Sequence, residues 1–266
     1  MSDTRREETA RLRRTRRQGI TKASASYRQD LAEIHDDGFG FIARGAATLL
    51  LRELAAAGHR AGMIAELACG GGISARIFAD AGFDVVGYDI SAPMIEIARR
   101  RVPEARFETV SIYDAELPEC VAVTAIGEAF NYRFDPRAGR ASLDAMFVRA
   151  FDALRPGGML IFDVAQPGRA LPRLEHHVFA GAGWRVTSEV VEDPAARRLE
   201  RRITSVREVD GVPRESSELH ELELYDPEEI FERLRGAGFR PRQLAAYSPD
   251  YYFGLGHGGY LAVKPA

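Results

Sequence analysis

The stretch that decides the fold is Met63-Ile-Ala-Glu-Leu-Ala-Cys-Gly-Gly-Gly72, followed by Phe83-Asp-Val-Val-Gly-Tyr-Asp89. Its first six residues are mostly apolar, as in a parallel strand covered on both faces. Three glycines then allow a sharp turn and a close approach of the backbone to a ligand, because glycine has no Cβ. Apolar residues at helical spacing follow, and Asp89 lies where an acid at the end of a second strand meets a ribose. The stretch therefore predicts a nucleoside-binding βαβ unit.

The glycine turn does not fit the dinucleotide fingerprint Gly-x-Gly-x-x-Gly. A frame that starts at Ala68 places Ala68, Gly70 and Ile73 at the three glycine positions. The third glycine of that fingerprint permits close contact between helix and strand, and here it is replaced by a branched residue. An NAD-dependent oxidoreductase is therefore disfavoured.

The segment Glu66-Leu-Ala-Cys-Gly-Gly-Gly72 instead resembles motif I of the class I S-adenosylmethionine (SAM)-dependent methyltransferases of the small-molecule, Rossmann-like type. In that motif an acid precedes Leu-Gly-Cys-Gly-x-Gly, so Glu66 stands for the commoner Asp and Ala68 for the first glycine. The resemblance covers roughly residues 60–264. Four further landmarks of the family follow in the same order: Tyr88-Asp-Ile-Ser-x-x-Met94, Val110 to Pro118, Arg155-Pro-Gly-Gly158 and Leu234 to Phe239.

The resemblance implies an α/β fold with a seven-stranded, mostly parallel, doubly wound sheet in a domain over residues 41–266. An antiparallel β insertion is expected between the fifth and sixth strands, because residues 183–224 alternate polar and apolar around an Asp210-Gly211 turn signal. In similar small-molecule methyltransferases extra strands cover the acceptor, although a sheet extension or a dimer surface is an open alternative. The strands of the main sheet are expected near 63–68, 84–88, 106–110, 121–126, 159–164, 241–247 and 259–263.

The same resemblance implies which residues hold the cofactor SAM. Glu66 would bind its amino group, and Asp89 both ribose hydroxyls. Ser111 takes the place of the acid that meets the adenine amino group, and Cys69 is interpreted as a small packed residue rather than a nucleophile. The implied cofactor-binding residues are Tyr27, Glu66, Ala68, Cys69, Gly70, Gly72, Asp89, Ile90, Met94, Ser111, Ile112 and Ala125.

The acceptor is expected to meet the residues after the fourth strand. There Glu128 would act as a general base or bind a cation, and Asn131 and Tyr132 would orient the acceptor. A helix cap or a salt bridge is the alternative role for Glu128. His35 joins these three as a catalytic candidate, whereas His220, in an alternating strand, is predicted to face solvent. No metal site is predicted, since adjacent His176 and His177 point apart on regular structure.

Residues 1–40 are predicted to form a basic arm and a helical lid. The first 22 residues hold eight basic and three acidic side chains, a charge of +5 that leaves −8 for the rest of a chain of net charge −3. Such an arm can bind RNA phosphates, but it has no interleaved aromatic residues for base stacking. Tyr27, His35 and Phe39 are expected to line or close the site; an ordinary apolar helix face is the open alternative.

Composition sets the remaining expectations. The 266 residues, 45% hydrophobic and 28% charged, are enough for one large core, and no apolar run approaches the ~20 residues of a membrane span. Two cysteines without metal-ligand spacing predict a reducing cytoplasm. We expect a monomer or homodimer that methylates a small-molecule acceptor by direct in-line transfer, without nucleic acid or membrane. Cyclisation of SAM, transfer of another SAM substituent, and RNA methylation through the basic arm remain alternatives.

Overall fold

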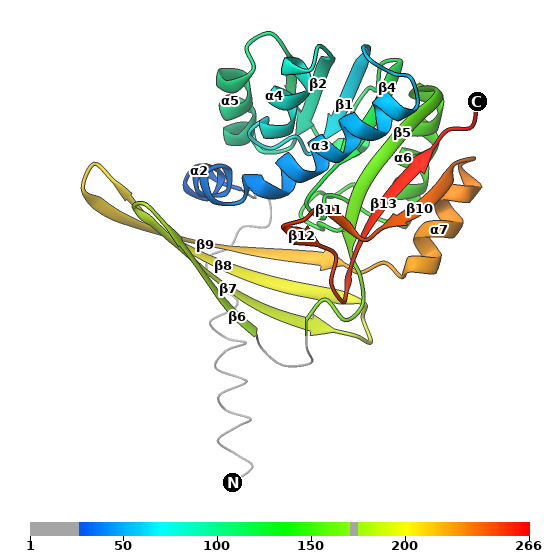
Figure 1. Ribbon diagram of the computed structural model, residues 1–266. Coiled ribbons are helices and arrows are strands. Elements are labelled where there is room, and N and C mark those ends of the chain that lie inside the picture. Colours follow the sequence, from blue (N-terminus) through cyan, green and yellow to red (C-terminus); the bar gives the residue numbers. More distant parts are fainter. Residues whose placement is uncertain (1–26, 171–174) are drawn as a thin grey trace.

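The computed structural model describes residues 27–170 and 175–266 (Figure 1). The predicted basic arm, residues 1–22, lies outside the described residues. In chain order the helices are α2 (Gln29–Gly38), α3 (Gly40–Ala56), α4 (Ile73–Asp80), α5 (Ala92–Arg101), the short 3-10 helix η1 (Ile112–Asp114), α6 (Arg140–Ala153) and α7 (Pro227–Gly236). The strands are β1 (Met63–Leu67), β2 (Asp84–Asp89), β3 (Arg106–Thr109), β4 (Cys120–Ala125), β5 (Leu154–Ala165), β6 (Glu175–Gly181), β7 (Trp184–Asp193), β8 (Arg198–Val209), β9 (Val212–Glu223), β10 (Arg240–Leu244), β11 (Ala246–Ser248), β12 (Tyr251–Tyr252) and β13 (His257–Val263).

The main sheet has seven strands in the order β10-β13-β5-β4-β1-β2-β3, which confirms the predicted fold. All neighbouring strands from β5 to β3 are parallel, and β13 runs antiparallel to both β5 and β10. The chain order reverses between β1 and β4. Their carboxyl ends therefore border the crevice in which open α/β sheets bind ligands.

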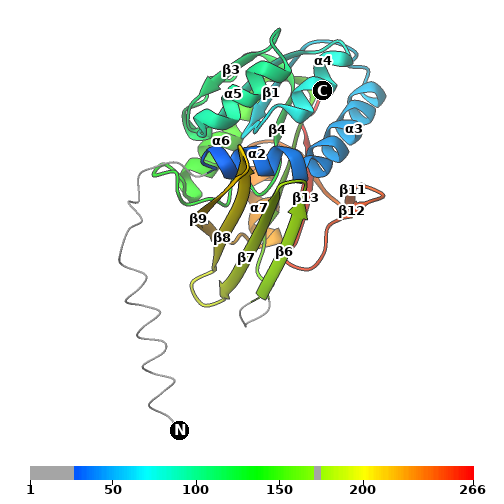
Figure 2. The same ribbon diagram turned by 90° about the vertical axis from the view of Figure 1, so that its left-hand side faces the viewer.

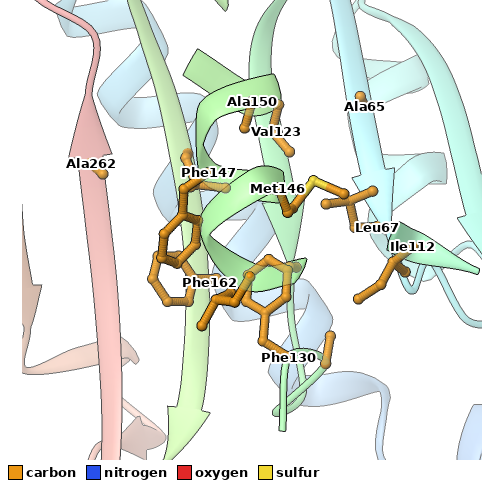
Figure 3. Close-up of a cluster of buried hydrophobic side chains, with 14 of the residues drawn as sticks. Ala65, Leu67, Ile112, Val123, Phe130, Met146, Phe147, Ala150, Phe162 and Ala262 are labelled. Atoms are coloured by element: carbon orange, nitrogen blue, oxygen red, sulfur yellow. The ribbon is translucent and has the colours of Figure 1, made fainter. Parts of the chain in front are cut away.

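Helices cover both faces of this sheet, and each face has its own hydrophobic core (Figures 1 and 2). One core contains buried residues of α3, α4 and α5, including Leu50 and Phe78. The other contains residues of α6 and α7 and a group of contacting rings, Phe130, Phe147 and Phe162, that lies between α6 and the strands (Figure 3). The sheet is thus rigidly held, and the loops at its edge can be positioned accurately.

The insertion between β5 and β10 is a four-stranded antiparallel sheet, β6-β7-β8-β9, beside the carboxyl edge of the main sheet. Three of its strands match the prediction, and Asp210 and Gly211 form the predicted turn with positive φ angles of 52° and 77°. The predicted start at residue 183 was wrong, because β6 adds a strand from Glu175. Nearly every residue of β6 is exposed, so it lacks the alternating burial that marked the other three.

Helix α2 lies between the insertion and the main domain, against α5 on one side and β8 on the other (Figure 2). Ion pairs fasten it on both sides: Asp36 binds Arg101 of α5 at 2.6 Å, and Asp30 binds Arg214 of β9 at 2.6 Å. The predicted apolar face is present, since Leu31 and Ile34 are buried. Within residues 27–170 and 175–266, no helix combines the length and hydropathy needed to cross a bilayer.

Candidate active site

A pocket opens where the carboxyl ends of β1, β2 and β4 meet, and it encloses about 100 Å³. The predicted glycine turn, the acid at the end of β2 and the loop after β4 all contribute to its wall. Two residues of the N-terminal segment, Tyr27 and His35, contribute as well. The lining residues are Tyr27, His35, Ala68, Gly70, Asp89, Ile90, Met94, Ile112, Tyr113, Ile126, Gly127, Ala129, Tyr132, Phe134 and Asp135.

The glycine turn needs left-handed backbone at three places. Ala68, Gly70 and Gly72 have φ angles of 54°, 53° and 75°. Ala68 therefore adopts a conformation that glycine takes without a steric penalty, and this accounts for the glycine at that place in the family motif. Gly72 is the N-cap residue of α4, and a Cβ there would lie 3.1 Å from the Cβ of Ala98.

Cys69 does not reach the pocket, although the sequence implied that it binds cofactor. Its side chain is buried in the core beneath the turn, and burial raises the pKa of its thiol well above the usual value. A thiol in this state is a weak nucleophile. The interpretation of Cys69 as a small packed residue agrees with this environment.

Asp89 ends β2 with its carboxylate against the pocket. Its two oxygens accept hydrogen bonds from the backbone N–H groups of Gly70 at 3.0 Å and Ser91 at 2.8 Å. Burial nevertheless raises the pKa of Asp89 to about 6. The carboxylate thus joins the glycine turn to the start of α5, at the place predicted for ribose binding.

Glu66 lies on β1, two residues before Ala68 of the turn, and is almost fully buried. Its Oε2 atom has no hydrogen-bond partner among the described residues, and burial raises the pKa of Glu66 to about 7. A buried carboxylate oxygen without a partner is costly unless a ligand supplies a donor. The position therefore suits the predicted contact with an ammonium group.

The wall predicted to meet the adenine differs from the expectation in one residue. Ser111 does not line the pocket; its hydroxyl donates to the carboxylate of Asp135, 24 positions along the chain. Asp135 does line the pocket, with Ile112 and Tyr113 beside it. The sequence pattern indicated the place of Ser111, but not the acid that folding brings to it.

Glu128 is held as an ion pair. Its two carboxylate oxygens accept from Arg169 Nε at 2.8 Å and from Arg201 at 2.9 Å, and its backbone has a φ of 60°. Although burial alone would raise the pKa of Glu128, the two guanidinium groups hold it far below the usual value. Such a carboxylate is a poor general base. This environment contradicts the predicted base and agrees with the salt-bridge alternative.

Asn131 also makes its hydrogen bonds within the protein. Its amide bonds the backbone of Ala165 through both Nδ2 and Oδ1 and donates to the carbonyl of Glu223. The side chain is fully buried and does not line the pocket, so the prediction that it orients the acceptor was wrong. Asn131 instead ties the loop after β4 to the end of β5 and to the insertion.

Tyr27 contacts both Tyr132 and His35, and all three line the pocket. The hydroxyl oxygens of Tyr132 and Tyr27 are 3.1 Å apart, and the rings of Tyr27 and His35 are in edge contact. Burial lowers the pKa of His35 to about 4, so its imidazole is neutral at pH 7. The structure brings these predicted residues together.

His220 was predicted to face solvent, and this was wrong. It is fully buried, its Nε2 lies 2.9 Å from Glu218, and its ring contacts Tyr27, Tyr132 and Phe134. The face of β9 that carries it is covered by the N-terminal segment and the loop after β4. His176 and His177 are half exposed on β6, and each pairs with a different glutamate.

Nine of the sixteen predicted site residues line the pocket: Tyr27, His35, Ala68, Gly70, Asp89, Ile90, Met94, Ile112 and Tyr132. The other seven do not line it: Glu66, Cys69, Gly72, Ser111, Ala125, Glu128 and Asn131. Sequence reasoning missed the roles of Phe134, Asp135 and Arg201. Only Asp135 carried a usable signal, as an acid shortly after the fourth strand.

The chain is similar to known methyltransferases in sequence and in fold. A family model described as a methyltransferase domain matches residues 64–158. A dTDP-3-amino-3,6-dideoxy-alpha-D-glucopyranose N,N-dimethyltransferase of Streptomyces fradiae is 30% identical over 143 residues, 52% of this chain and 54% of that protein. The chain thus matches about half the length of this curated relative.

Solved structures resemble the chain over nearly its whole length. A SAM-dependent methyltransferase from Clostridium acetobutylicum superposes with a TM-score of 0.74 at 16% identity, over 88% of this chain and 98% of that one. The sugar N-methyltransferase KedS8 of Streptoalloteichus has a TM-score of 0.71 at 20% identity, over 93% and 98%. At these identities the likeness establishes the fold. A methyltransferase-domain family model thus matches residues 64–158, and the chain shares the fold of solved SAM-dependent methyltransferases.

Proposed function

We propose that the protein transfers a methyl group from SAM to a small-molecule acceptor by direct in-line displacement. The observation that carries the proposal is the pocket at the carboxyl ends of β1, β2 and β4, where the glycine turn, Asp89 and Tyr132 face one space. A pocket at this place in an open α/β sheet is suited to a nucleoside. The sulfonium of SAM supplies an activated methyl group, so the protein has to align the two substrates and exclude water.

Each cofactor-binding residue is assigned to the part of SAM that suits its chemistry. Glu66, with its unpartnered oxygen, binds the ammonium group. Asp89 accepts from the ribose hydroxyls, and the glycine turn lets the backbone approach. Asp135, held by Ser111 beside Ile112, is placed to accept from the adenine amino group. Two observations support this assignment. The residue types match those of the family motifs, and in the described part of the chain no buried cation lies beside Glu66.

The acceptor we propose is a small amine, and an amino sugar is the first class to test. The relatives named as a dideoxy-amino-sugar N,N-dimethyltransferase and a sugar N-methyltransferase support this choice. The site supports it as well, since an amine that binds in its neutral form needs no strong base. Tyr132 and the neutral imidazole of His35 can accept a hydrogen bond from it and orient its lone pair.

Both cysteines are buried free thiols, which supports the predicted reducing cytoplasm.

Product analysis tests the proposal. The protein is incubated with SAM and a panel of nucleotide-linked amino sugars, with matched hydroxyl sugars as controls, and the sulfur-containing product is identified by mass spectrometry. Formation of S-adenosylhomocysteine that depends on an amino sugar is expected. Methylthioadenosine formed without an acceptor would instead indicate cyclisation of SAM. Turnover with the hydroxyl sugars and not with the amino sugars would show that the acceptor atom is oxygen and not nitrogen.

A further inference from the structure

Glu218, on β9 of the insertion, is a buried carboxylate with three donors at hydrogen-bond distance and the Arg28 guanidinium in an ion pair at 3.5 Å. Its oxygens accept from the backbone N–H of Tyr27 at 2.8 Å and of Arg28 at 2.9 Å, and one oxygen lies 2.9 Å from Nε2 of His220. The side chain is only 6% exposed. This carboxylate therefore holds the chain at the point where the N-terminal segment enters α2.

Tyr27 is held in an unfavourable backbone conformation by these contacts. Its φ is 53°, in the left-handed region that residues with a Cβ seldom adopt. Three bonds fix it there: its N–H to Glu218, its carbonyl from the Ser91 hydroxyl at 2.8 Å, and its hydroxyl with Tyr132. A non-glycine residue stays in this conformation only where its surroundings enforce it.

The contact with Ser91 extends the chain of bonds to the cofactor side. Ser91 caps the N-terminus of α5, and its backbone N–H donates to Asp89. Glu218, Tyr27, Ser91 and Asp89 are therefore linked by consecutive hydrogen bonds. The insertion, the N-terminal segment and the ribose-binding position form one connected unit.

His220 has the geometry of a residue that orients this carboxylate. Its Nε2 faces Glu218, whereas its Nδ1 is buried with no partner among the described residues. Its ring is enclosed by Tyr27, Tyr132 and Phe134. An imidazole held in this way keeps one donor directed at the carboxylate, so that both oxygens stay aimed at the backbone of Tyr27 and Arg28.

We propose that Glu218, oriented by His220, is a positioning residue that anchors Tyr27 over the pocket and thereby makes cofactor affinity depend on the insertion. This rests on the proposed function only in its choice of ligand, S-adenosylhomocysteine. Neither residue lines the pocket; Glu218 acts through Tyr27, and His220 contacts Tyr27 together with Tyr132 and Phe134. Glutamine cannot replace Glu218, because its amide nitrogen would face a backbone donor instead of accepting from it.

The test compares Glu218→Gln with Glu215→Gln, an exposed glutamate on the same strand that gives the same change in charge. Hydrogen exchange of residues 27–38 is measured in the free protein, and S-adenosylhomocysteine affinity by calorimetry. For Glu218→Gln we expect at least tenfold faster exchange in this segment and at least fivefold weaker affinity. Glu215→Gln should match the parent protein in both.

The pair His220→Gln and His220→Leu separates orientation from packing. The glutamine amide can still donate to Glu218, so His220→Gln should stay near the parent, whereas His220→Leu should follow Glu218→Gln. Parent-like exchange and affinity in Glu218→Gln would overturn the proposal, as would equal effects of the two His220 variants. If the parent itself fails to bind S-adenosylhomocysteine, the proposed function fails, while the exchange comparison still decides the anchor.

Discussion

Asp163 on β5 and His257 on β13 form a buried pair, with Oδ2 of the carboxylate 2.9 Å from Nε2 of the imidazole. The same carboxylate accepts from the backbone N–H groups of Gly127 and Glu128 and from the hydroxyl of Tyr247. Two neighbouring antiparallel strands thus fix the first turn of the loop that carries Tyr132.

This arrangement predicts that substitutions of Tyr247 and Asp163 lower the stability of the protein by different amounts. Tyr247→Phe removes one hydrogen bond and should lower the free energy of unfolding by about 1 kcal/mol. Asp163→Asn should cost at least about 2 kcal/mol, because its amide nitrogen would face buried backbone donors. Chemical denaturation of both variants measures the difference, and equal losses would contradict the shared role assigned to the carboxylate.

Asp89→Ala should weaken S-adenosylhomocysteine binding by at least about 2 kcal/mol, since each hydrogen bond to a charged group contributes about 1.5–3 kcal/mol. The matched control is Asp84→Ala, because Asp84 begins the same strand and is exposed at its far end. Calorimetry on folded proteins measures both affinities. Unchanged affinity in Asp89→Ala would remove Asp89 from the ribose site.

Binding of S-adenosylhomocysteine should strengthen as the pH rises to about 7. The pKa of Glu66 is raised to about 7, so below this pH the free protein holds a neutral acid, whereas the ligand ammonium favours the carboxylate. Affinity should therefore fall by up to about tenfold per pH unit below 7 and level off above it. Glu66→Gln should remove this inflection and leave the one expected near pH 6 from Asp89. A parent profile that stays flat between pH 5 and 8 would contradict the role of Glu66.

Helix α2 should act as a lid. The pocket of about 100 Å³ is below the roughly 300 Å³ of a typical small-molecule site, and Tyr27 and His35 line it. We expect S-adenosylhomocysteine to slow hydrogen exchange in residues 27–38 and to leave α7, on the opposite face, unchanged. Equal protection with and without ligand would indicate a permanently docked helix.

The strands were predictable from sequence because each is a short apolar or alternating run bounded by turn residues. β6 was not predictable, since exposure on both faces leaves no pattern to detect. His220 shows a different limit. Alternation predicts which residues share a face of β9, but a contact 193 residues away, with Tyr27, decides that this face is buried.

The same limit applies to the candidate site. Asp89 and the glycine turn were predictable because their spacing within one βαβ unit fixes their positions. Glu128 was misjudged because its partners, Arg169 and Arg201, come from segments that only the complete fold brings together. Local pattern thus predicts a cofactor cradle better than it predicts the charge balance around an acceptor.

The bonds from Glu218 to Tyr27 and Arg28 also bear on how this chain can be re-engineered. Residues 175–224 form a contiguous block that can be exchanged while the segment from Met63 to Asp135 stays intact. A grafted block without a carboxylate at position 218 would leave two backbone donors unsatisfied at the entrance to α2. Blocks for chimeras should therefore be chosen first for a carboxylate at position 218 and only then for their shape.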